Sequence, residues 1–478
     1  MDENQLNILF SNGILVDSSI KEVKIADLDG LISTLKNKNI NFLDVGTFHE
    51  LYDGEVAADS DIEIIKNYGG EISESKPPNW VNYFNDRFNR LKNILMSKDR
   101  SGLMSLSNIK NLPQSSDVKT IVIVSSVSVS PVKKYTIMDI EDNTGSYKAI
   151  ITNSNQEILE DQVILLSGRK YNDAIFVKDI IFPEIQMKEK VKQDIDDSFV
   201  LFLSDIHIGS KLFVADAFEK FIKWINGEMP EYSSIAKLVK FIVFNGDLID
   251  GIGVYPDQEK ELEIKDLKGQ YNRLYEFLDR IPKNIKLILS QGNHDATHIA
   301  EPQPKLDKNF AESLYRLKNA VFLSNPYQVN LIVRKSKTSL LSYHGFSITY
   351  YANKIPKYSK MDADDIENIM KIHLKSRHIA PSHGSVQLMP LPRDYLVIDE
   401  TPDIYATGHI HKTLASIYKG TVLINSSCWQ YQTSYQKKYG MVPDVAKIPV
   451  VNLRDKSFQI LDFLGDKVQI YKKGLKEV

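Results

Sequence analysis

The chain has one cysteine, Cys428, among its 478 residues. A lone cysteine excludes an intramolecular disulfide and is typical of a reducing compartment. No apolar run is long enough to cross a bilayer, and the first ten residues lack the basic and then apolar pattern of a signal peptide. We therefore expect a soluble, cytoplasmic protein without a membrane partner.

Neither sign of charge is in clear excess, since the formal net charge is only -3. The overall charge therefore does not indicate nucleic-acid binding, although a local basic face could be hidden in the sum. The composition, 42% hydrophobic and 25% charged, is that of a globular protein. Because 478 residues exceed one ordinary core, we expect two or three domains.

The first region, residues 1–70, is acidic and contains two helix-like patterns, at 4–16 and 25–36. These patterns predict a small, helical docking domain. Gln5, Ile8 and Phe10 faintly resemble a sliding-clamp-binding peptide, although the usual aromatic pair is missing. A sliding clamp is therefore a second, weaker partner hypothesis.

Two further regions precede the long carboxyl-terminal part. Residues 71–115 combine a polar linker, GGEISESKPPN, with an amphipathic helix whose apolar face contains Phe84, Phe88, Leu91 and Leu95. Residues 116–190 contain five short apolar runs separated by turns, which predicts a Greek-key barrel of the OB type. Such barrels bind single strands or act as protein adaptors, and the lack of interleaved aromatic and basic residues favours the adaptor at least equally.

Residues 191–478 show strand-like runs that alternate with helical segments: FVLFL, FIVFN, IKLILS, SLLSY and TVLIN. This alternation predicts α/β architecture. Ligands in such sheets bind beyond the carboxyl ends of the strands. Polar residues stand directly after most of these runs, so we expect a site there.

The residues at these strand ends form an ordered set of potential metal ligands. Each fragment alone is weak evidence for a metal site, because Asp-x-His, Gly-Asp and single histidines are common. The whole set is stronger evidence, because its members recur at successive strand ends: Asp205, His207, Asp247, Asn293, His344, His409 and His411.

Carboxylates and imidazoles in this combination predict two divalent cations that act together on a phosphodiester. Such a pair needs a bridging carboxylate, and Asp247, in a glycine-preceded turn, suits that position. The mixed donors favour Mn, Fe or Zn over Mg or Ca. His294 adjoins a ligand and is predicted to stabilise or protonate the leaving oxygen.

The sequence leaves two assignments in the predicted metal site open. His383-Gly384 competes with His344-Gly345, and we favour His344 because it ends an apolar strand. Asp250 could contact the metals, but a supporting or helix-capping role is favoured. The other histidines are interpreted as surface or structural residues: His49, His298, His373, His378 and His383.

The strand-end set resembles that of the calcineurin-like metallophosphoesterases. The resemblance implies an α/β sandwich with one metal held by residues 205, 207, 247 and 411, a second held by residues 247, 293, 344 and 409, and His294 as the catalytic histidine that binds neither. Longer segments, among them SDIHIGSKLF, NGDLIDGIGVYPDQEKEL, DYLVIDETPDIYATGHIHKT and INSSCWQYQTSYQKKYGMVP, are similar to the small subunit of archaeal family D DNA polymerase. The resemblance extends to roughly residues 79–460, because it includes the segment WVNYFNDRFNRLKNIL and the predicted barrel that follows it in the sequence.

This resemblance implies a manganese-dependent 3′–5′ exonuclease that proofreads DNA at a single-stranded or primer 3′ end. It also implies a large catalytic polymerase subunit as partner, in a heterodimer or larger assembly. Two alternatives remain. The chain could be a catalytically silent scaffold or assembly subunit, or a phosphodiesterase that acts on substrates other than DNA.

Overall fold

The structure is a computed structural model that describes residues 3–17, 28–37, 40–43, 60–152, 157–189, 191–229 and 231–472. It divides into two compact units, Met1–Asp61 and Ile62–Val478. Among the described residues, no helix is long and apolar enough to cross a membrane.

The N-terminal unit contains two short helices and a pair of short strands, α1 (Glu3–Ser11), β1 (Leu15–Val16), α2 (Leu28–Asn37) and β2 (Phe42–Leu43). The first helical pattern was expected to reach residue 16, but the helix ends at Ser11. Gly13, with a φ of 78°, turns the chain into β1, which pairs in parallel with β2. Leu9, Leu31 and Leu35 are fully buried between these elements. Of the clamp-like residues, Ile8 packs against this core and Phe10 is exposed, so clamp binding stays a prediction.

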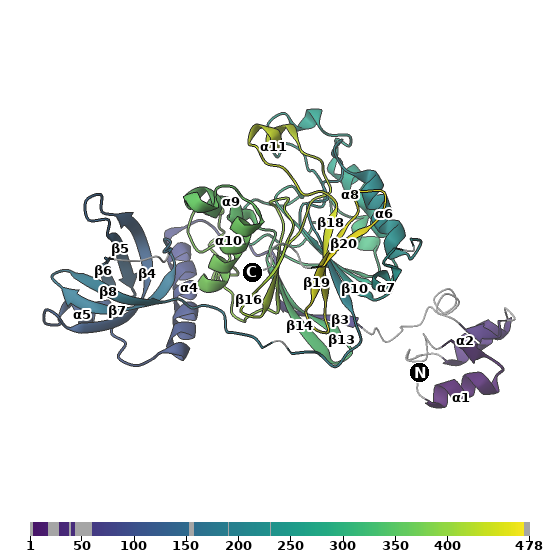
Figure 1. Ribbon diagram of the computed structural model, residues 1–478, viewed down its shortest axis with the longest axis horizontal. Coiled ribbons are helices and arrows are strands. Elements are labelled where there is room, and N and C mark those ends of the chain that lie inside the picture. The colour runs from purple at the N-terminus through teal and green to yellow at the C-terminus, as the bar shows by residue number, and fades with distance from the viewer. Residues whose placement is uncertain are drawn as a thin grey trace. The chain divides into compact units, whose positions relative to one another are not determined.

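A closed five-stranded barrel follows in the second unit (Figure 1). Its strand order, β4-β5-β6-β8-β7, includes one parallel pair, β6 with β8, and agrees with the expected OB fold. Short helix α5 (Leu106–Lys110) precedes the barrel, and apolar side chains from its strands fill the interior. The strands are β4 (Asp117–Val129), β5 (Thr136–Asp142), β6 (Gly145–Ile151), β7 (Val163–Tyr171) and β8 (Ala174–Ile181).

Helix α4 (Pro77–Lys98) begins with two prolines, which suit the first turn of a helix. Its apolar stripe of Phe88, Leu91 and Leu95 is buried in one cluster with barrel residues and with Val397. The predicted amphipathic helix therefore joins the barrel to the carboxyl-terminal part of the chain.

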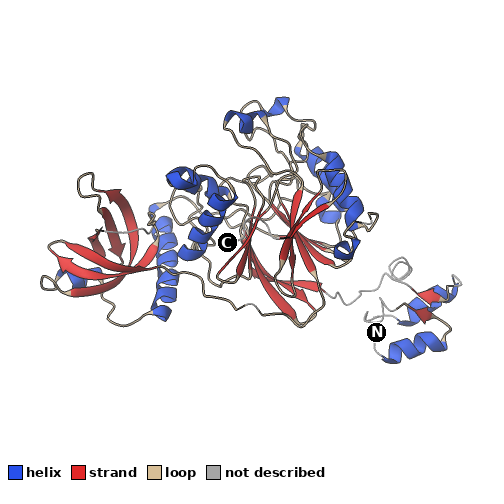
Figure 2. Ribbon diagram, in the orientation of Figure 1, coloured by secondary structure: helices blue, strands red, loops and turns tan. Residues whose placement is uncertain are grey.

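The carboxyl-terminal part contains two sheets, seen as red arrows in Figure 2. The seven-stranded sheet has the order β12-β11-β10-β9-β18-β19-β20, and the six-stranded sheet has the order β16-β17-β15-β14-β13-β3. The first sheet consists of β9 (Phe199–Leu203), β10 (Val239–Asn245), β11 (Lys286–Ser290), β12 (Ala320–Phe322), β18 (Lys447–Asn452), β19 (Phe458–Asp462) and β20 (Gln469–Lys472). The second consists of β3 (Ser60–Lys66), β13 (Tyr327–Val333), β14 (Ser336–Ser342), β15 (Ile404–Thr407), β16 (Leu414–Tyr418) and β17 (Thr421–Asn425).

Strand β3 comes from a region that the sequence assigned to the N-terminal domain. The expected boundary at residue 70 falls after this strand, whereas the compact units divide after Asp61. The difference arises because β3 is the edge strand beside β13, so all but its first two residues belong to the second unit. Tyr68, which directly precedes the expected linker, is buried.

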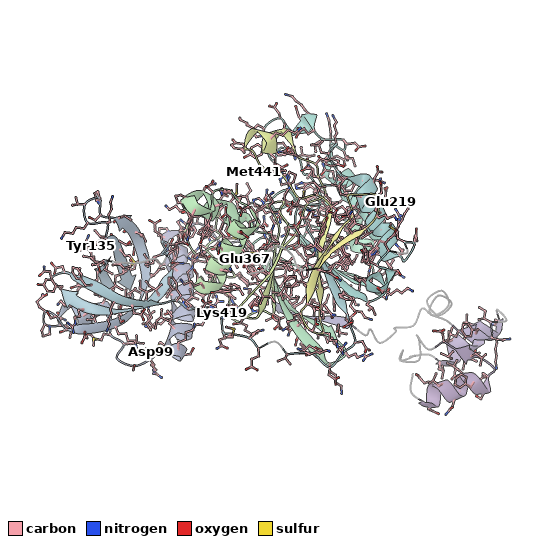
Figure 3. All side chains as sticks on the ribbon, viewed as in Figure 1. Asp99, Tyr135, Glu219, Glu367, Lys419 and Met441 are labelled. Carbon is pink, nitrogen blue, oxygen red and sulfur yellow. The ribbon has the colours of Figure 1, made fainter. Side chains whose placement is uncertain are left out.

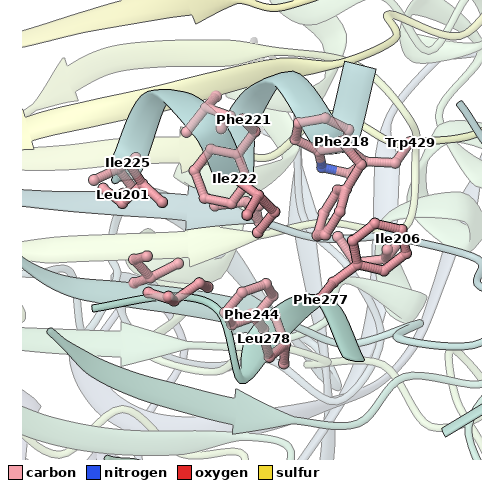
Figure 4. Close-up of a cluster of buried hydrophobic side chains, with 14 of the residues drawn as sticks. Leu201, Ile206, Phe218, Phe221, Ile222, Ile225, Phe244, Phe277, Leu278 and Trp429 are labelled. Atoms are coloured by element: carbon pink, nitrogen blue, oxygen red, sulfur yellow. The ribbon is translucent and has the colours of Figure 1, made fainter. Parts of the chain in front are cut away.

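Each strand of the central sheet divides its side chains between two cores. Along β9, Val200 and Phe202 face the layer between the sheets, whereas Leu201 and Leu203 face the helices. In that outer layer Phe218 and Phe221 of α6 (Ala215–Ile225) pack with Trp429 (Figure 4). Side chains fill the space between all these layers (Figure 3).

Helices cover the outer face of each sheet. Helices α6 and α8 (Leu267–Leu278) share a core with β9, β10 and β11. Helices α9 (Phe346–Lys354) and α10 (Ala363–Ser376) share another with strands of the six-stranded sheet. The remaining short helices are α7 (Ser233–Ala236), η2 (Gln258–Lys260), η3 (Leu314–Arg316), η4 (Pro356–Tyr358) and α11 (Ser434–Lys438).

Candidate metal centre

The site residues follow parallel strands of both sheets. Strands β9, β10 and β11 are mutually parallel, as are β14 and β15. Within each sheet the carboxyl ends therefore share one edge, and the contact of Asp247 with His344 brings the two edges together. The loops that leave these ends carry, in chain order, Asp205, Asp247, Asn293, His344 and His409.

One group of donors consists of Asp205, His207 and His411, whose ligand atoms lie within 4.8 Å of one another. Nε2 of His411 lies 3.3 Å from Oδ1 of Asp205 and 3.1 Å from Nε2 of His207. Among the described residues, that carboxylate oxygen has no hydrogen-bond donor although it is buried. These three potential ligand atoms thus face the same point, which is the arrangement that a cation requires.

A second group consists of Asp247, His344 and His409, again within 4.8 Å. Oδ2 of Asp247 lies 3.3 Å from Nε2 of His344, and that nitrogen lies 3.2 Å from Oδ1 of Asn293. The structure therefore brings all seven predicted ligand residues to one edge, in two adjoining groups.

His294 lies beside both groups. Its ring centroid is 4.6 Å from that of His207, and its backbone N–H donates to Oδ1 of Asp247 at 2.8 Å. Nδ1 lies 2.7 Å from the carbonyl oxygen of Asp250. Because a carbonyl oxygen only accepts, Nδ1 carries the proton, and Nε2 is the nitrogen left for a ligand.

The backbone at this edge adopts an uncommon conformation. Five of the seven residues have positive φ angles between 50° and 70°: Asp205, His207, Asp247, His409 and His411. Such angles are uncommon outside glycine, although Asp and His tolerate them better than most residues, and they concentrate at functional sites.

Two glycines permit the close approach of neighbouring segments. A Cβ on Gly292 would stand 2.3 Å from Oδ1 of Asp247, and a Cβ on Gly408 would stand 2.0 Å from Oγ of Ser204. These positions therefore need glycine because site residues from other strands occupy the space.

The charges of the site compensate one another. Burial opposes ionisation of Asp247, yet His344 holds the pKa of that carboxyl well below its usual range. Burial likewise opposes the charged form of His344, but Asp247 raises the pKa of this imidazole to about 10. Burial and the neighbouring His344 lower the pKa of His409 to about 3. Within the protein, the positive charge of His344 offsets the buried carboxylate of Asp247, and a divalent cation would supply the same compensation.

A layer of supporting residues holds the candidate ligands. Oδ1 of Asp250 lies 3.1 Å from Nδ1 of His207, and Asp250, His207 and His294 form a third group of potential ligands, so both the supporting role and the ligand role of Asp250 stay predictions. The backbone oxygen of Asn245 lies 2.9 Å from Nδ1 of His344. Nε2 of Gln436 lies 2.9 Å from Nδ1 of His411.

Sequence reasoning missed Gln430 and Gln436. Gln430 donates to Asp250 at 2.9 Å. A signal existed for Gln436, because it stands three residues after Thr433 and completes a capping box with it. Nothing in the local sequence connects Gln430 to Asp250.

The structure also distinguishes His344 from His383, the two candidates for one ligand position. His344 is 1% exposed within the donor group, whereas His383 is exposed and lies against Trp80, with ring centroids 5.0 Å apart. His373 and His378 are buried in hydrogen-bonded core positions, His298 is partly buried, and His49 lies outside the described residues.

The fold and the chemistry of this edge define the class of the domain. Residues 200–413 match the family model of calcineurin-like phosphoesterases, as the strand-end set indicated. An archaeal phosphodiesterase of known structure shares 15% identity over 55% of this chain and 98% of its own, with a TM-score of 0.28, which is too low to support further argument.

Sequence relatives give the narrower assignment. The chain is 37% identical over 410 residues to the DNA polymerase II small subunit of Methanothermobacter thermautotrophicus, covering 82% of each chain. It is 34% identical over 416 residues to that of Pyrococcus furiosus, covering 84% of this chain and 66% of the relative. The chain therefore belongs to the family of archaeal DNA polymerase II small subunits, which confirms the resemblance found in the sequence.

Proposed function

We propose that this chain is a metal-dependent 3′–5′ DNA exonuclease that works with a separate, large polymerase subunit. The observation that carries the proposal is the pair of adjoining donor groups at the strand ends, with an unsatisfied, buried carboxylate oxygen on Asp205. A scaffold that never bound metal would gain nothing from burying these groups together.

The donor chemistry fits two divalent cations. Asp205, His207 and His411 would hold one, and Asn293, His344 and His409 would hold the other, with Asp247 between them. The nitrogen-rich set suits Mn, Fe or Zn better than Mg, and we favour Mn. When bound, such a pair supplies Lewis acidity and lowers the pKa of water.

His294 is the candidate for proton transfer. Its Nδ1–H is engaged by the carbonyl of Asp250, which fixes the orientation of the ring. In the imidazolium form, Nε2 would donate a proton to the leaving 3′ oxygen. The side chain is 14% exposed, so a substrate could reach it.

The family supports the proposed substrate and direction of cleavage. The relatives are small subunits of a DNA polymerase, so a large catalytic subunit is the expected partner. A polymerase leaves its errors at the growing 3′ end. A phosphodiesterase beside it therefore serves proofreading by removing nucleotides from that end.

The test is degradation of a 5′-labelled single-stranded oligonucleotide with Mn²⁺. The wild type should give a ladder that shortens from the 3′ end. EDTA should abolish it, and Asp247→Ala should reduce the rate by more than about 100-fold, since even groups behind a ligand contribute 10–100-fold. Asp279→Ala, at an exposed position, is the matched control.

Two outcomes would favour the alternatives. No degradation, even with the large subunit added, would favour a silent scaffold. Hydrolysis of a small chromogenic diester without any attack on DNA would favour a phosphodiesterase with another substrate.

A further inference from the structure

Three tyrosine rings extend outward from His294. The ring of Tyr255 lies 6.3 Å from that of His294, Tyr435 lies 5.8 Å from Tyr255, and Tyr439 lies 4.8 Å from Tyr435. These spacings are those of neighbouring aromatic side chains in contact. Tyr255, Tyr435 and Tyr439, here called the tyrosine track, therefore form one aromatic surface that starts at the candidate centre.

The outer part of the track is open to solvent. Tyr435 is 44% exposed and Tyr439 is 57% exposed. Grouped exposed aromatic rings commonly mark a binding surface rather than a packed core. Both belong to α11 or directly follow it, and this helix is labelled in Figure 1.

Hydrogen bonds attach the track to the centre. The hydroxyl of Tyr255 donates to Oε2 of Glu261 at 3.0 Å, and Oε1 of the same carboxylate accepts from the N–H of Ser434 at 3.2 Å. Gln436, between the two outer tyrosines, reaches Nδ1 of His411 at 2.9 Å. The rings are thus held at a fixed position relative to the donor groups.

Basic residues are interleaved with the outer rings. Lys437 and Lys438 separate Tyr435 from Tyr439, and both are exposed. Neither forms an ion pair with another residue in the described part of the chain, and Nζ of Lys438 lies 5.9 Å from the ring centroid of Tyr439. Glu261, the acidic neighbour, has both oxygens occupied by the contacts above.

Stacking rings interleaved with cations are the arrangement that binds unpaired nucleic acid, because every base has a face to stack and every phosphate a charge. We infer that the tyrosine track binds the last unpaired nucleotides of a single strand and thereby positions the terminal phosphodiester at the candidate centre. This inference rests on the proposed function.

The inference includes a preference among substrates. Bases inside a duplex are already stacked on one another, so a paired end must fray before it can occupy the rings. The track therefore favours single-stranded and mismatched ends over paired ones.

The first test is binding without catalysis. Fluorescence anisotropy of a 5′-labelled ten-nucleotide oligodeoxythymidylate is measured in EDTA with the full chain. Tyr435→Ala combined with Tyr439→Ala should weaken binding by about tenfold or more, because each stacked base contributes substantially. The two Tyr→Phe changes should bind like the wild type. Tyr471→Ala, 45% exposed on β20, is the matched control.

A modified probe separates stacking from phosphate contact. An oligonucleotide whose last three residues lack bases should bind the wild type as weakly as the intact probe binds the double alanine variant. Equal affinity of the wild type for both probes would overturn the inference, as would no measurable binding of the intact probe. A double variant that binds DNA normally but fails to associate with the large subunit would show a protein-binding surface instead.

Kinetics distinguish the failure of the track from failure of the exonuclease. With Mn²⁺, the double alanine variant should raise KM for the oligonucleotide and leave hydrolysis of a small chromogenic diester unchanged. If the wild type binds the oligonucleotide through the rings but never cleaves it, the exonuclease proposal is refuted and the binding role of the tyrosine track is supported. If cleavage proceeds with the same KM in both proteins, the exonuclease proposal is supported and the binding role of the track is refuted.

Discussion

Two buried groups of histidine and aspartate in this chain have similar composition and opposite character. At the strand ends, Oδ1 of Asp205 has no hydrogen-bond donor among the described residues, and Nε2 atoms of His207 and His411 face each other at 3.1 Å. Beneath α4, by contrast, Asp394 accepts from Nε of Arg87 at 2.7 Å and contacts Nε2 of His378 at 2.9 Å.

The second group is complete without a ligand. Nδ1 of His378 accepts from the N–H of Ala380, and Oδ1 of Asp394 accepts from the N–H of Leu396. Burial would raise the pKa of Asp394, but His378 and the guanidinium of Arg87 hold it well below its usual range. The comparison teaches that residue types alone do not identify a metal centre. A buried carboxylate oxygen without a hydrogen-bond donor, facing imidazole nitrogens, distinguishes the first group from the second.

The largest expected effect on stability comes from breaking the complete group. Arg87→Ala leaves the carboxylate of Asp394 buried without its cation, which should cost about 3–5 kcal/mol of unfolding free energy. Urea denaturation measures this loss, and the proposed nuclease activity per folded molecule should stay unchanged. Arg273→Ala, an exposed pair on α8, is the control. A loss no larger than that of the control would contradict the contrast between the two groups.

Acid should weaken the same group. Burial and the nearby charge of Arg87 lower the pKa of His378 from 6.5 to about 4. Between these values the unfolded chain binds a proton that the folded chain does not, so stability falls as the pH falls from 6.5 to 4. The loss amounts to roughly 3 kcal/mol at about 1.4 kcal/mol per pKa unit. His378→Gln should show a shallower decline in denaturation at pH 6.5, 5 and 4, and parallel curves would refute this account.

Metal should stabilise only the unsatisfied group. At a Mn²⁺ concentration 100 times Kd, binding to the folded state adds about 2.7 kcal/mol, so Tm should rise relative to EDTA. Asp247→Ala should abolish or strongly reduce this rise, whereas Arg87→Ala should retain it. Thermal unfolding followed by circular dichroism gives the measurement, and an equal rise in the Asp247 variant would place the metal elsewhere.

The smallest expected effect concerns a residue behind the ligands. Asp250→Asn keeps the volume but removes the charge that faces Nδ1 of His207 at 3.1 Å. Metal affinity or activity should fall by about 10–100-fold, less than for Asp247→Ala. Mn²⁺ titrations of the two variants show whether Asp250 contributes less to metal affinity than the candidate ligand Asp247. An Asp250 variant as inactive as the Asp247 variant would make Asp250 a direct ligand.

The sequence was informative where function and secondary structure share a short segment. Polar residues such as Asp205 or Asp247 follow closely after most of the apolar runs, and the carboxyl ends of parallel strands must share an edge. The barrel and the amphipathic helix were predictable for the same reason, because their periodicity is local.

Contacts between distant segments were decided by the tertiary structure alone. Local sequence did not reveal β3 as part of the six-stranded sheet, because an edge strand is defined by its neighbour β13. It missed Gln430, since nothing near that residue points to Asp250. The tyrosine track likewise joins Tyr255 to Tyr435, 180 positions later in the chain. Periodicity and strand-end residues are properties of the chain, whereas an unsatisfied buried carboxylate and a row of contacting rings exist only once packing has brought separate segments together.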